Sequence, residues 1–429
     1  MKKPNILLLM SDQQRWDSLG CNGNSFVSSP HIDRLAAEGV RCENSFTPWP
    51  VCTPARATMW TGVYPHQHKL KFNSYRMTNL FEDVSYERRT VFDALKEADY
   101  TTAYFGKWHL GDDAPPMFDV WEGFNSLGGH WVDGRKDGVY KPDLQTNQLI
   151  RFLEQQANAG KPFIAVNGFY PPHDPYTAPK RFYEPYRGKG VPFAGYYAAV
   201  SALDHNVGRT METLDRLGLR DDTIVVYFSD HGDTFRYREG WMYKFVCHED
   251  AIKVPFIVNC PARIRRGATL DSMIGLQDLM PTILDWAGLD IPDHLHGQSL
   301  VPLLAGESVD WREAYYVQNI LFQDNVEQRC IRTKEWKLIL SDRPRTVRGY
   351  SSPNHLFDLV NDPEEELDLY DAPYEDQHNQ YGHYPPFTDL IVELAQSLRK
   401  HAEEIGDTFG CDVADNCLIE MKHRSTRNA

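Results

Sequence analysis

Residues 223–233 read TIVVYFSDHGD, and this stretch shows the pattern on which the fold prediction rests. The β-branched and aromatic run 223–228 predicts a strand, which ends in the polar cluster 229–233. Similar apolar runs recur along the chain, separated by helix-length amphipathic segments. The other predicted strands are 5–10, 101–105, 162–169 and 254–259, and the predicted helices are 31–38, 90–98, 144–157, 194–217 and 276–287. This alternation predicts an α/β domain with a largely parallel sheet flanked by helices.

The alternation of strands and helices stops after Leu304. From residue 314 onward, short strands are predicted close together at 314–318, 328–333 and 336–340, followed by polar turns and one amphipathic helix at 387–405. We therefore predict two domains: a larger α/β domain at 1–309 and a smaller C-terminal α+β domain at 310–429.

The composition is that of an acidic globular protein. A hydrophobic content of 41%, with 12% aromatic residues, excludes global disorder. The net charge of −15 offers no general attraction to nucleic acid or anionic lipid. No apolar stretch approaches the roughly 20 residues that span a bilayer. We expect neither nucleic acid nor membrane as a partner, and homo-oligomerisation is left open.

The apolar run at 6–10 is too short for the core of a signal peptide and lacks a small-residue cleavage site. We therefore expect no signal peptide in this chain, which corresponds to a cytoplasmic protein or to a processed periplasmic or secreted form. The compartment stays open.

Chemically capable residues follow four of the predicted strands. Ligands of open α/β sheets bind beyond the carboxyl ends of the strands, so these clusters are predicted to share one rim. They are Asp12-Gln13, Lys107-Trp108-His109, His173-Asp174 and Asp230-His231.

Two of these clusters have the composition of a metal site. Asp12 and Asp230 offer hard carboxylate oxygens, Gln13 an amide oxygen and His231 an imidazole. Such a set suits Ca²⁺ or Mg²⁺, and a directly bound imidazole favours Mn²⁺. The alternative is that Asp12 and Asp230 only cap the helices that follow them.

The segment Cys52-Thr53-Pro54-Ala55-Arg56 predicts the start of a helix, with Thr53 as N-cap and Pro54 in the first position. Cys52 would then lie at the positive end of the helix dipole, close to the side chain of Arg56. Both features lower the pKa of a thiol. The residues alone leave a buried structural cysteine and a cysteine nucleophile as alternatives.

The same segment matches the C-x-P-x-R core of the sulfatase family. GKWHLG at 106–111 resembles that family's second signature, and SDHGD follows in the same order. The resemblance extends over nearly the whole chain. It implies an alkaline-phosphatase-like fold and hydrolysis of a sulfate ester, most simply of a sulfated sugar or other small organic sulfate. It also implies that a formylglycine-generating enzyme converts Cys52 to formylglycine, and that one divalent metal is bound, Ca²⁺ first and Mn²⁺ second.

By this resemblance, one hydroxyl of the formylglycine hydrate attacks sulfur and the second allows the aldehyde to re-form as sulfate leaves. Arg56 and His109 orient or deprotonate the hydrate. Lys107, His173 and Lys244 hold sulfate oxygens or protonate the leaving alcohol.

The metal positions depart from the Asp-Asp and Asp-Asn of many sulfatases. Asp12-Gln13 and Asp230-His231 are similar to choline-sulfatase-like and phosphonate-monoester-hydrolase-like branches and to some sulfated-glycan sulfatases. A phosphonate monoester or phosphodiester hydrolase of the same fold is therefore one alternative function. An unconverted metal- or glycan-binding pseudoenzyme is the other.

Several further residues are candidates for substrate recognition. Trp108, Trp131 and Trp241 could stack on a sugar ring or belong to the core. Arg236 and Arg238 would point to one side of an extended segment and grip a second anionic group, or instead pair with acids such as Glu239. Asn73 could contribute its side-chain amide to the active site, or it could simply form part of a turn.

Overall fold

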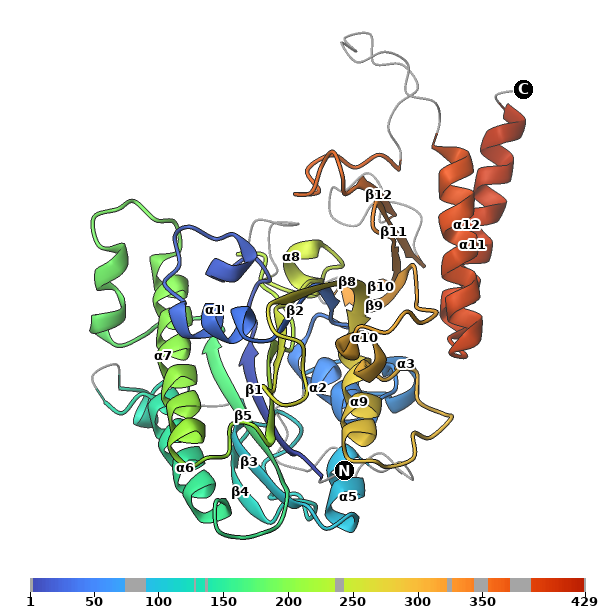
Figure 1. The fold of residues 1–429 in the computed structure, drawn as a ribbon. Helices are drawn as coiled ribbons and strands as arrows, with labels where there is room; N and C mark the ends of the chain where they lie inside the picture. The colour runs from blue at the N-terminus through green and yellow to red at the C-terminus, as the bar shows by residue number, and fades with distance from the viewer. Residues whose placement is uncertain are drawn as a thin grey trace. The chain divides into compact units, whose positions relative to one another are not determined.

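The computed structural model describes residues 3–73, 90–126, 129–135, 138–235, 243–321, 326–342, 354–370 and 387–427 (Figure 1). The chain forms two compact units. The first comprises Met1–Lys244 and Lys253–Asp310, and the second comprises Phe245–Ile252 and Trp311–Ala429. The segment Phe245–Ile252, which we predicted in the first domain, therefore groups with the second.

Within the described residues, the first unit contains a sheet of eight strands. In chain order they are β1 (Asn5–Asp12), β2 (Val40–Phe46), β3 (Thr101–Lys107), β4 (Val120–Phe124), β5 (Phe163–Pro172), β6 (Thr223–Ser229), β7 (Phe256–Asn259) and β8 (Ala268–Gly275). Their order across the sheet is β4-β3-β5-β1-β6-β7-β2-β8. The neighbours from β4 to β6 pair in parallel, as do β2 and β8, whereas β7 runs antiparallel to both β6 and β2. The predicted, largely parallel α/β sheet is confirmed.

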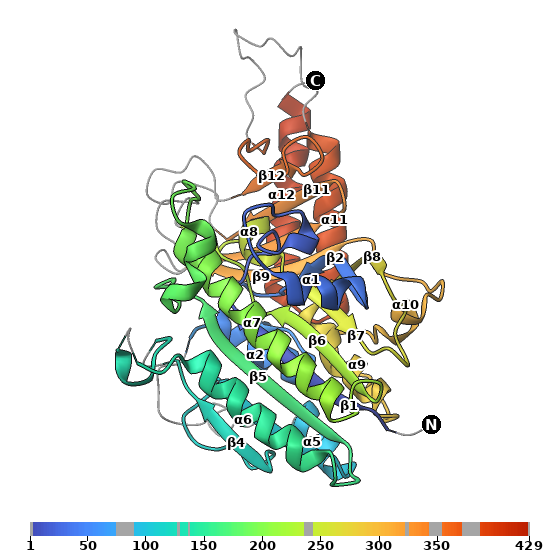
Figure 2. The ribbon, with the colours of Figure 1, turned by 60° about the vertical axis from the view of Figure 1, so that its left-hand side comes forward.

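Helices cover both faces of this sheet (Figures 1 and 2). On one face lie α1 (Pro30–Ala37), α6 (Lys141–Gln156) and α7 (Ala194–Arg216), and on the other lie α2 (Cys52–Thr61), α5 (Val91–Glu97) and α9 (Leu279–Trp286). The short helices α3 (Pro65–His68) and α10 (Val301–Ala305) complete the unit. Apolar side chains of β1 and β3, such as Leu7 and Phe105, pack against Phe152 of α6 and Val207 of α7. Burial of these side chains fixes the sheet under its helices.

The strand order brings four strand ends together. β3, β5, β1 and β6 are adjacent and parallel, so their carboxyl ends lie along one edge of the sheet. Lys107 and Asp12 are the last residues of β3 and β1, while His173 and Asp230 directly follow β5 and β6. The predicted shared rim therefore exists, and it is where the candidate site forms.

The second unit contains a four-stranded antiparallel sheet, in the part of the chain that the structure describes. Its order is β12-β11-β10-β9, formed by β9 (Tyr315–Leu321), β10 (Val326–Arg332), β11 (Trp336–Ser341) and β12 (His355–Asp358). The helices of this unit are α8 (Glu249–Ile252), α11 (Thr388–Glu404) and α12 (Thr408–Arg427). The predicted α+β character is correct, although β12 and α12 were not foreseen.

A buried carboxylate ties the helices of the second unit to its sheet. Asp407, directly before α12, accepts hydrogen bonds from Tyr316 Oη at 2.8 Å and Gln318 Nε2 at 2.6 Å. It also forms an ion pair with the buried Arg329 at 2.5 Å. Removal of this carboxylate would leave the buried Arg329 guanidinium with Glu327, 3.3 Å away, in place of its closer counter-charge.

We expect Asp407→Ala to lower the free energy of unfolding by about 3–5 kcal/mol, the usual cost of breaking a buried ion pair. Urea unfolding of the full chain, followed by circular dichroism, measures the change. Asp415→Ala is the matched control, because Asp415 pairs with Arg399 on an exposed face of the same helix pair and should cost about 1 kcal/mol or less. Equal losses in the two variants would contradict the anchoring role of Asp407.

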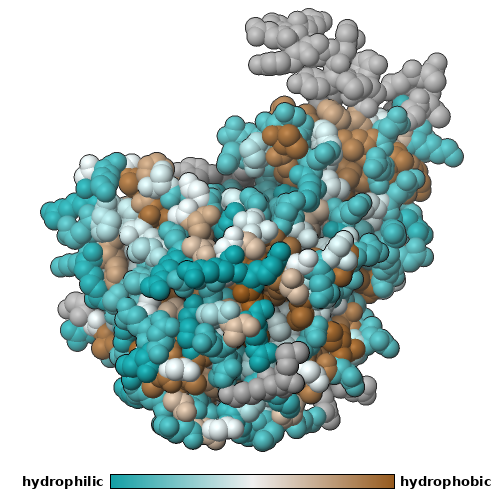
Figure 3. Space-filling view, viewed as in Figure 1, coloured by the Kyte–Doolittle hydropathy of each residue, from teal (hydrophilic) through white to brown (hydrophobic). Residues whose placement is uncertain are grey.

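The described helices include none that is long and apolar enough to cross a membrane. The face shown in Figure 3 is largely hydrophilic, with apolar side chains scattered between the polar ones. This surface agrees with the acidic, charged composition of the chain.

Candidate active site

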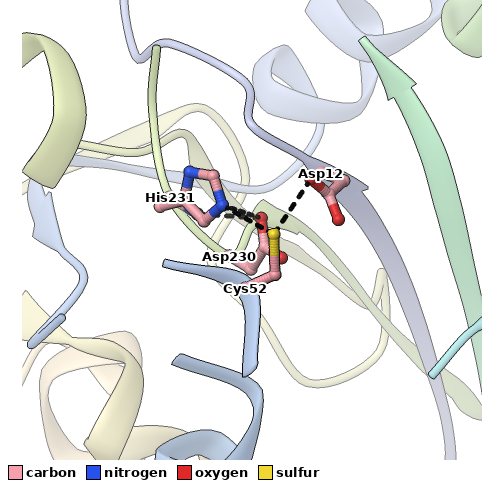
Figure 4. Close-up of side chains that lie close together, drawn as sticks. All are labelled: Asp12, Cys52, Asp230 and His231. Atoms are coloured by element: carbon pink, nitrogen blue, oxygen red, sulfur yellow. Dashed lines mark hydrogen bonds and ion pairs between the residues drawn. The ribbon is translucent and has the colours of Figure 1, made fainter. Parts of the chain in front are cut away.

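Four buried side chains meet at the carboxyl edge of the sheet (Figure 4). Asp12 comes from the end of β1, Cys52 from the start of α2, and Asp230 and His231 from the loop after β6. One ligand atom of each lies within 4.8 Å of those of the other three. Two strand ends and a helix start therefore converge on one small, water-excluded volume.

Cys52 is the first residue of α2, with Val51 in the N-cap position. The prediction of Thr53 as N-cap is wrong, because the Thr53 hydroxyl instead donates to the carbonyl oxygen of His109 at 2.9 Å. That bond ties the helix to the loop after β3. The backbone N–H of Thr53 donates to Asn73 Oδ1 at 3.1 Å, so the structure places Asn73 at the same helix terminus.

Arg56 joins the two acidic strand ends. Its Nη2 lies 2.8 Å from Asp12 Oδ2 and its Nε 2.9 Å from Asp230 Oδ2, and all three side chains are fully buried. The guanidinium also donates to the carbonyl oxygen of Lys107. One cation thus sets the spacing of two carboxylates that would otherwise repel each other.

Two lysines converge on Cys52 Sγ. Lys107 Nζ lies 3.6 Å from it and Lys244 Nζ 3.3 Å from it. Burial opposes ionisation of the Cys52 thiol, but the charges of Lys107 and Lys244 outweigh it and hold its pKa well below the usual value. Positive charge is therefore preorganised around the side chain of residue 52, where an anionic group would be bound.

The carboxyl groups differ in their surroundings. Burial and the charge of Cys52 oppose ionisation of Asp12, but Lys107, His173 and Arg56 outweigh them and lower its pKa. Burial, reinforced by the neighbouring Asp12, raises the pKa of Asp230. Two buried acids of this kind form a site that a divalent cation would neutralise.

The pKa values of the two histidines beside Cys52 shift in opposite directions. Burial and the positive charge of Lys107 lower the pKa of His109 to about 4, so this imidazole is neutral at neutral pH and able to accept a proton. For His173, burial and Lys244 are outweighed by hydrogen bonds to Asp174 and Cys52, and its pKa is raised. Asp174 raises the pKa of His173 because its Oδ1 lies 3.0 Å from His173 Nδ1. We did not foresee this role of Asp174, although it adjoins His173 in sequence.

Comparison with known proteins agrees with this geometry. The sulfatase family model matches residues 4–289, two thirds of the chain. The chain belongs to the sulfatase family. A second model, that of the C-terminal part of N-sulphoglucosamine sulphohydrolase, matches residues 238–382. The protein is accordingly an enzyme, and its fold is the alkaline-phosphatase-like fold that the sequence predicted.

Several members of the family resemble the chain over most of its length. An ulvan-active sulfatase of Formosa agariphila is 30% identical, over 95% of this chain and 82% of its own. An N-acetylglucosamine-6-O-sulfatase of Bacteroides thetaiotaomicron is 26% identical, over 79% of this chain and 78% of its own.

Solved structures share the fold. One is a complex with its substrate D-glucosamine-2-N,6-O-disulfate, with a TM-score of 0.79 and 23% identity over 95% of this chain and 99% of its own. Another is a phosphonate monoester hydrolase of Agrobacterium radiobacter, with a TM-score of 0.76 and 20% identity over 94% of this chain and 96% of its own.

The sulfatase family implies a divalent metal, and the side chains at the rim fit one. His231 Nδ1 lies 2.8 Å from the carbonyl oxygen of Gly232, which can only accept. Nδ1 therefore carries a hydrogen, and Nε2, 3.2 Å from Cys52 Sγ inside the cluster, is the nitrogen that could bind a metal. Two carboxylates and this nitrogen suit a hard divalent cation, with the imidazole favouring Mn²⁺ over Mg²⁺.

Two other predicted substrate residues of this sulfatase are buried. Trp108 is fully buried among Trp60, Tyr104 and Phe118, and Trp131 packs on Tyr140. Both belong to the core, so the interpretation of these two as sugar-stacking residues is wrong. Arg236, Arg238, Glu239 and Trp241 lie outside the described residues.

Proposed function

We propose that the chain hydrolyses sulfate esters of carbohydrates, with formylglycine formed from Cys52 as the nucleophile. The observation that carries this proposal is the position of Cys52 at the start of α2, between two buried lysines and a cluster of potential metal ligands. Formylglycine, as its hydrate, would supply a hydroxyl nucleophile and a second hydroxyl through which the aldehyde is regenerated. A bound divalent metal would make the nucleophilic hydroxyl more acidic.

The chain's own residues have distinct roles in this proposal. Asp12, Gln13, Asp230 and His231 hold the metal, and Arg56 fixes the spacing of the two carboxylates. Lys107 and Lys244 bind sulfate oxygens, because both ammonium groups already point at the side chain of residue 52. Neutral His109 accepts a proton from the hydrate, and His173 donates one to the leaving alcohol.

A sulfated sugar is the substrate class that the relatives support. The ulvan-active sulfatase and the N-acetylglucosamine-6-O-sulfatase are both named for sulfated carbohydrates, and each resembles this chain over most of its length. Arg236 or Arg238 would recognise a second anionic group on that substrate. Conversion of Cys52 requires a formylglycine-generating enzyme as a partner.

Comparing turnover of 4-nitrophenyl sulfate with that of an aryl phosphonate monoester tests the proposed reaction. We expect a clear preference in kcat/KM for the sulfate. A preference for the phosphonate would favour the alternative hydrolase of the same fold, to which the phosphonate monoester hydrolase is structurally similar. Absence of turnover on both, with an unconverted cysteine in the peptide, would favour a pseudoenzyme.

Replacement of His173 tests the assignment of the proton donor. We expect His173→Gln to lower kcat/KM by about 10²–10⁴-fold for alkyl sulfates, whose alkoxide leaving groups need a proton. For 4-nitrophenyl sulfate the loss should be much smaller, since nitrophenolate leaves without one. Lys107→Gln is the matched control, because a residue that binds sulfate oxygens should affect all these substrates alike. Lys244 does not serve here, since its Nζ lies 3.0 Å from His173 Nε2. An equal loss across leaving groups in His173→Gln would assign His173 to sulfate binding instead.

A further inference from the structure

The side-chain amide of Gln13 is held at both ends. Its Nε2 lies 2.7 Å from Asp233 Oδ2, and its Oε1 lies 2.8 Å from Lys244 Nζ. A carboxylate can only accept a hydrogen bond and an ammonium can only donate one. The chemistry of the two partners therefore fixes the amide: its NH₂ group faces Asp233, and its oxygen faces Lys244, whose Nζ lies 3.3 Å from Cys52 Sγ.

The backbone at Gln13 is fixed as well. Its φ of 62° lies in the left-handed region, which residues other than glycine rarely adopt. The N–H of Gln13 donates to Asp230 Oδ1 at 3.1 Å, and the next N–H, of Gln14, donates to Ser229 Oγ at 2.9 Å. The loop after β1 is thus attached to the loop after β6, and Gln13 occupies a defined place beside the metal cluster.

Asp233 is fully buried in the same loop system. Its Oδ2 also accepts a hydrogen bond from Tyr176 Oη at 2.7 Å, and its Oδ1 accepts one from the backbone N–H of Phe235 at 2.7 Å. Asp233 is not one of the four residues whose ligand atoms cluster around Cys52. It contacts Gln13, which directly follows one of them.

We propose that Asp233 is a positioning residue for the metal site: it binds the NH₂ group of Gln13 and so turns the amide oxygen toward the metal. This inference rests on the proposed function, in which Gln13 is a metal ligand. An amide that presented its NH₂ group to a cation would repel it, so a ligand in the Gln13 position needs an acceptor behind it. Outer partners of this kind typically change metal affinity by about 10–100-fold.

The isosteric variant Asp233→Asn tests the proposal. The new amide can keep its oxygen on the N–H of Phe235, so that its NH₂ group faces Gln13. Gln13 would then lie between two donors, the introduced NH₂ group and Lys244 Nζ, so its amide would no longer be held with its oxygen toward the metal. We expect the Kd for Ca²⁺ to rise by about 10–100-fold. Isothermal calorimetry on the full chain, stripped with a chelator and titrated with Ca²⁺ and separately with Mn²⁺, measures it.

A double variant that conserves the total charge tests whether metal binding can be rescued. In Gln13→Glu/Asp233→Asn the carboxylate moves from position 233 to position 13, so one oxygen can accept from the introduced amide while the other faces the metal. We expect metal affinity at or above that of the wild type, because the ligand now carries a charge. If affinity stays as low as in Asp233→Asn alone, the proposal is overturned. If Asp233→Asn alone fails to fold, the metal affinity of the double variant tests the proposal by itself.

A background variant separates positioning from general damage. In Gln13→Ala, the further change Asp233→Asn should leave metal affinity unchanged, because Asp233 acts through Gln13. Tyr176→Phe is the matched control, since it removes the other donor to Asp233 Oδ2 without touching the amide, and it should retain wild-type affinity. An Asp233→Asn variant that binds metal like the wild type, or that loses affinity equally in both backgrounds, refutes the positioning role. A wild-type chain that binds neither Ca²⁺ nor Mn²⁺ refutes the proposed metal site itself.

Discussion

Replacing Cys52 with alanine is expected to abolish sulfate ester hydrolysis and to leave the fold intact. Loss of a nucleophile commonly lowers kcat by about 10⁴-fold or more, because positioning and charge stabilisation act on a reaction that no longer has an attacking group. The fold should persist, since alanine suits the first turn of α2 and the buried network among Arg56, Asp12 and Asp230 stays complete. Steady-state assay with 4-nitrophenyl sulfate and circular dichroism measure the two properties.

Cys42→Ala is the matched control. Cys42 is also buried in the first unit, but burial raises the pKa of its thiol to about 12, and no lysine lies among the causes of that shift. Its replacement should leave the rate unchanged. The mass of the peptide that spans Val51 to Arg56 gives an independent reading, since conversion of cysteine to formylglycine lowers it by roughly 18 Da. A Cys52→Ala variant that retained a tenth of the wild-type rate would remove this residue from the mechanism.

The site residues that could be predicted from the sequence lie next to a clearly recognisable strand or within one helical segment. Asp12 and Asp230 follow apolar runs that read as strands without ambiguity, and parallel strands bring their ends to one edge. Cys52 and Arg56 were predictable because one helical segment carries both. By contrast, nothing in the sequence marks Asp233 as the partner of Gln13, since the two residues lie 220 positions apart.

The errors have identifiable causes. Thr53 and Pro54 carry strong signals for a helix start, but the Thr53 hydroxyl bonds to the loop after β3 instead. As a result, α2 begins two residues earlier than a Thr53 cap would allow. Trp108 lies between two site residues in sequence and nevertheless points into an aromatic core. Strand β2, with Arg41 and Glu43 among its residues, lacks the apolar run that identified its neighbours.

We expect the Asp230→Asn variant to lose both the bound metal and the activity. The substitution removes the negative charge of one of two carboxylates that would neutralise the cation, and affinity for Ca²⁺ depends strongly on the charge of its ligands. The amide oxygen can still accept from the backbone N–H groups of Gln13 and His231, which donate to Asp230 Oδ1 at 3.1 and 3.0 Å. Arg56 keeps its pair with Asp12 but loses its bond to position 230, because the introduced NH₂ group would face its Nε. The local fold should therefore survive while metal affinity falls by about 100-fold or more.

Elemental analysis of the purified variant and calorimetric titration with Ca²⁺ measure the loss. Asp204→Asn is the matched control, because Asp204 is a buried carboxylate of the same unit that accepts from the backbone N–H groups of His31 and Ile32. It should keep a full metal complement, although its stability falls. Excess Ca²⁺ should restore part of the activity of Asp230→Asn if the residue acts as a ligand, since mass action then refills the weakened site. A full metal complement in this variant, or a wild-type protein without metal, would contradict the assignment of Asp12 and Asp230 to one metal ion.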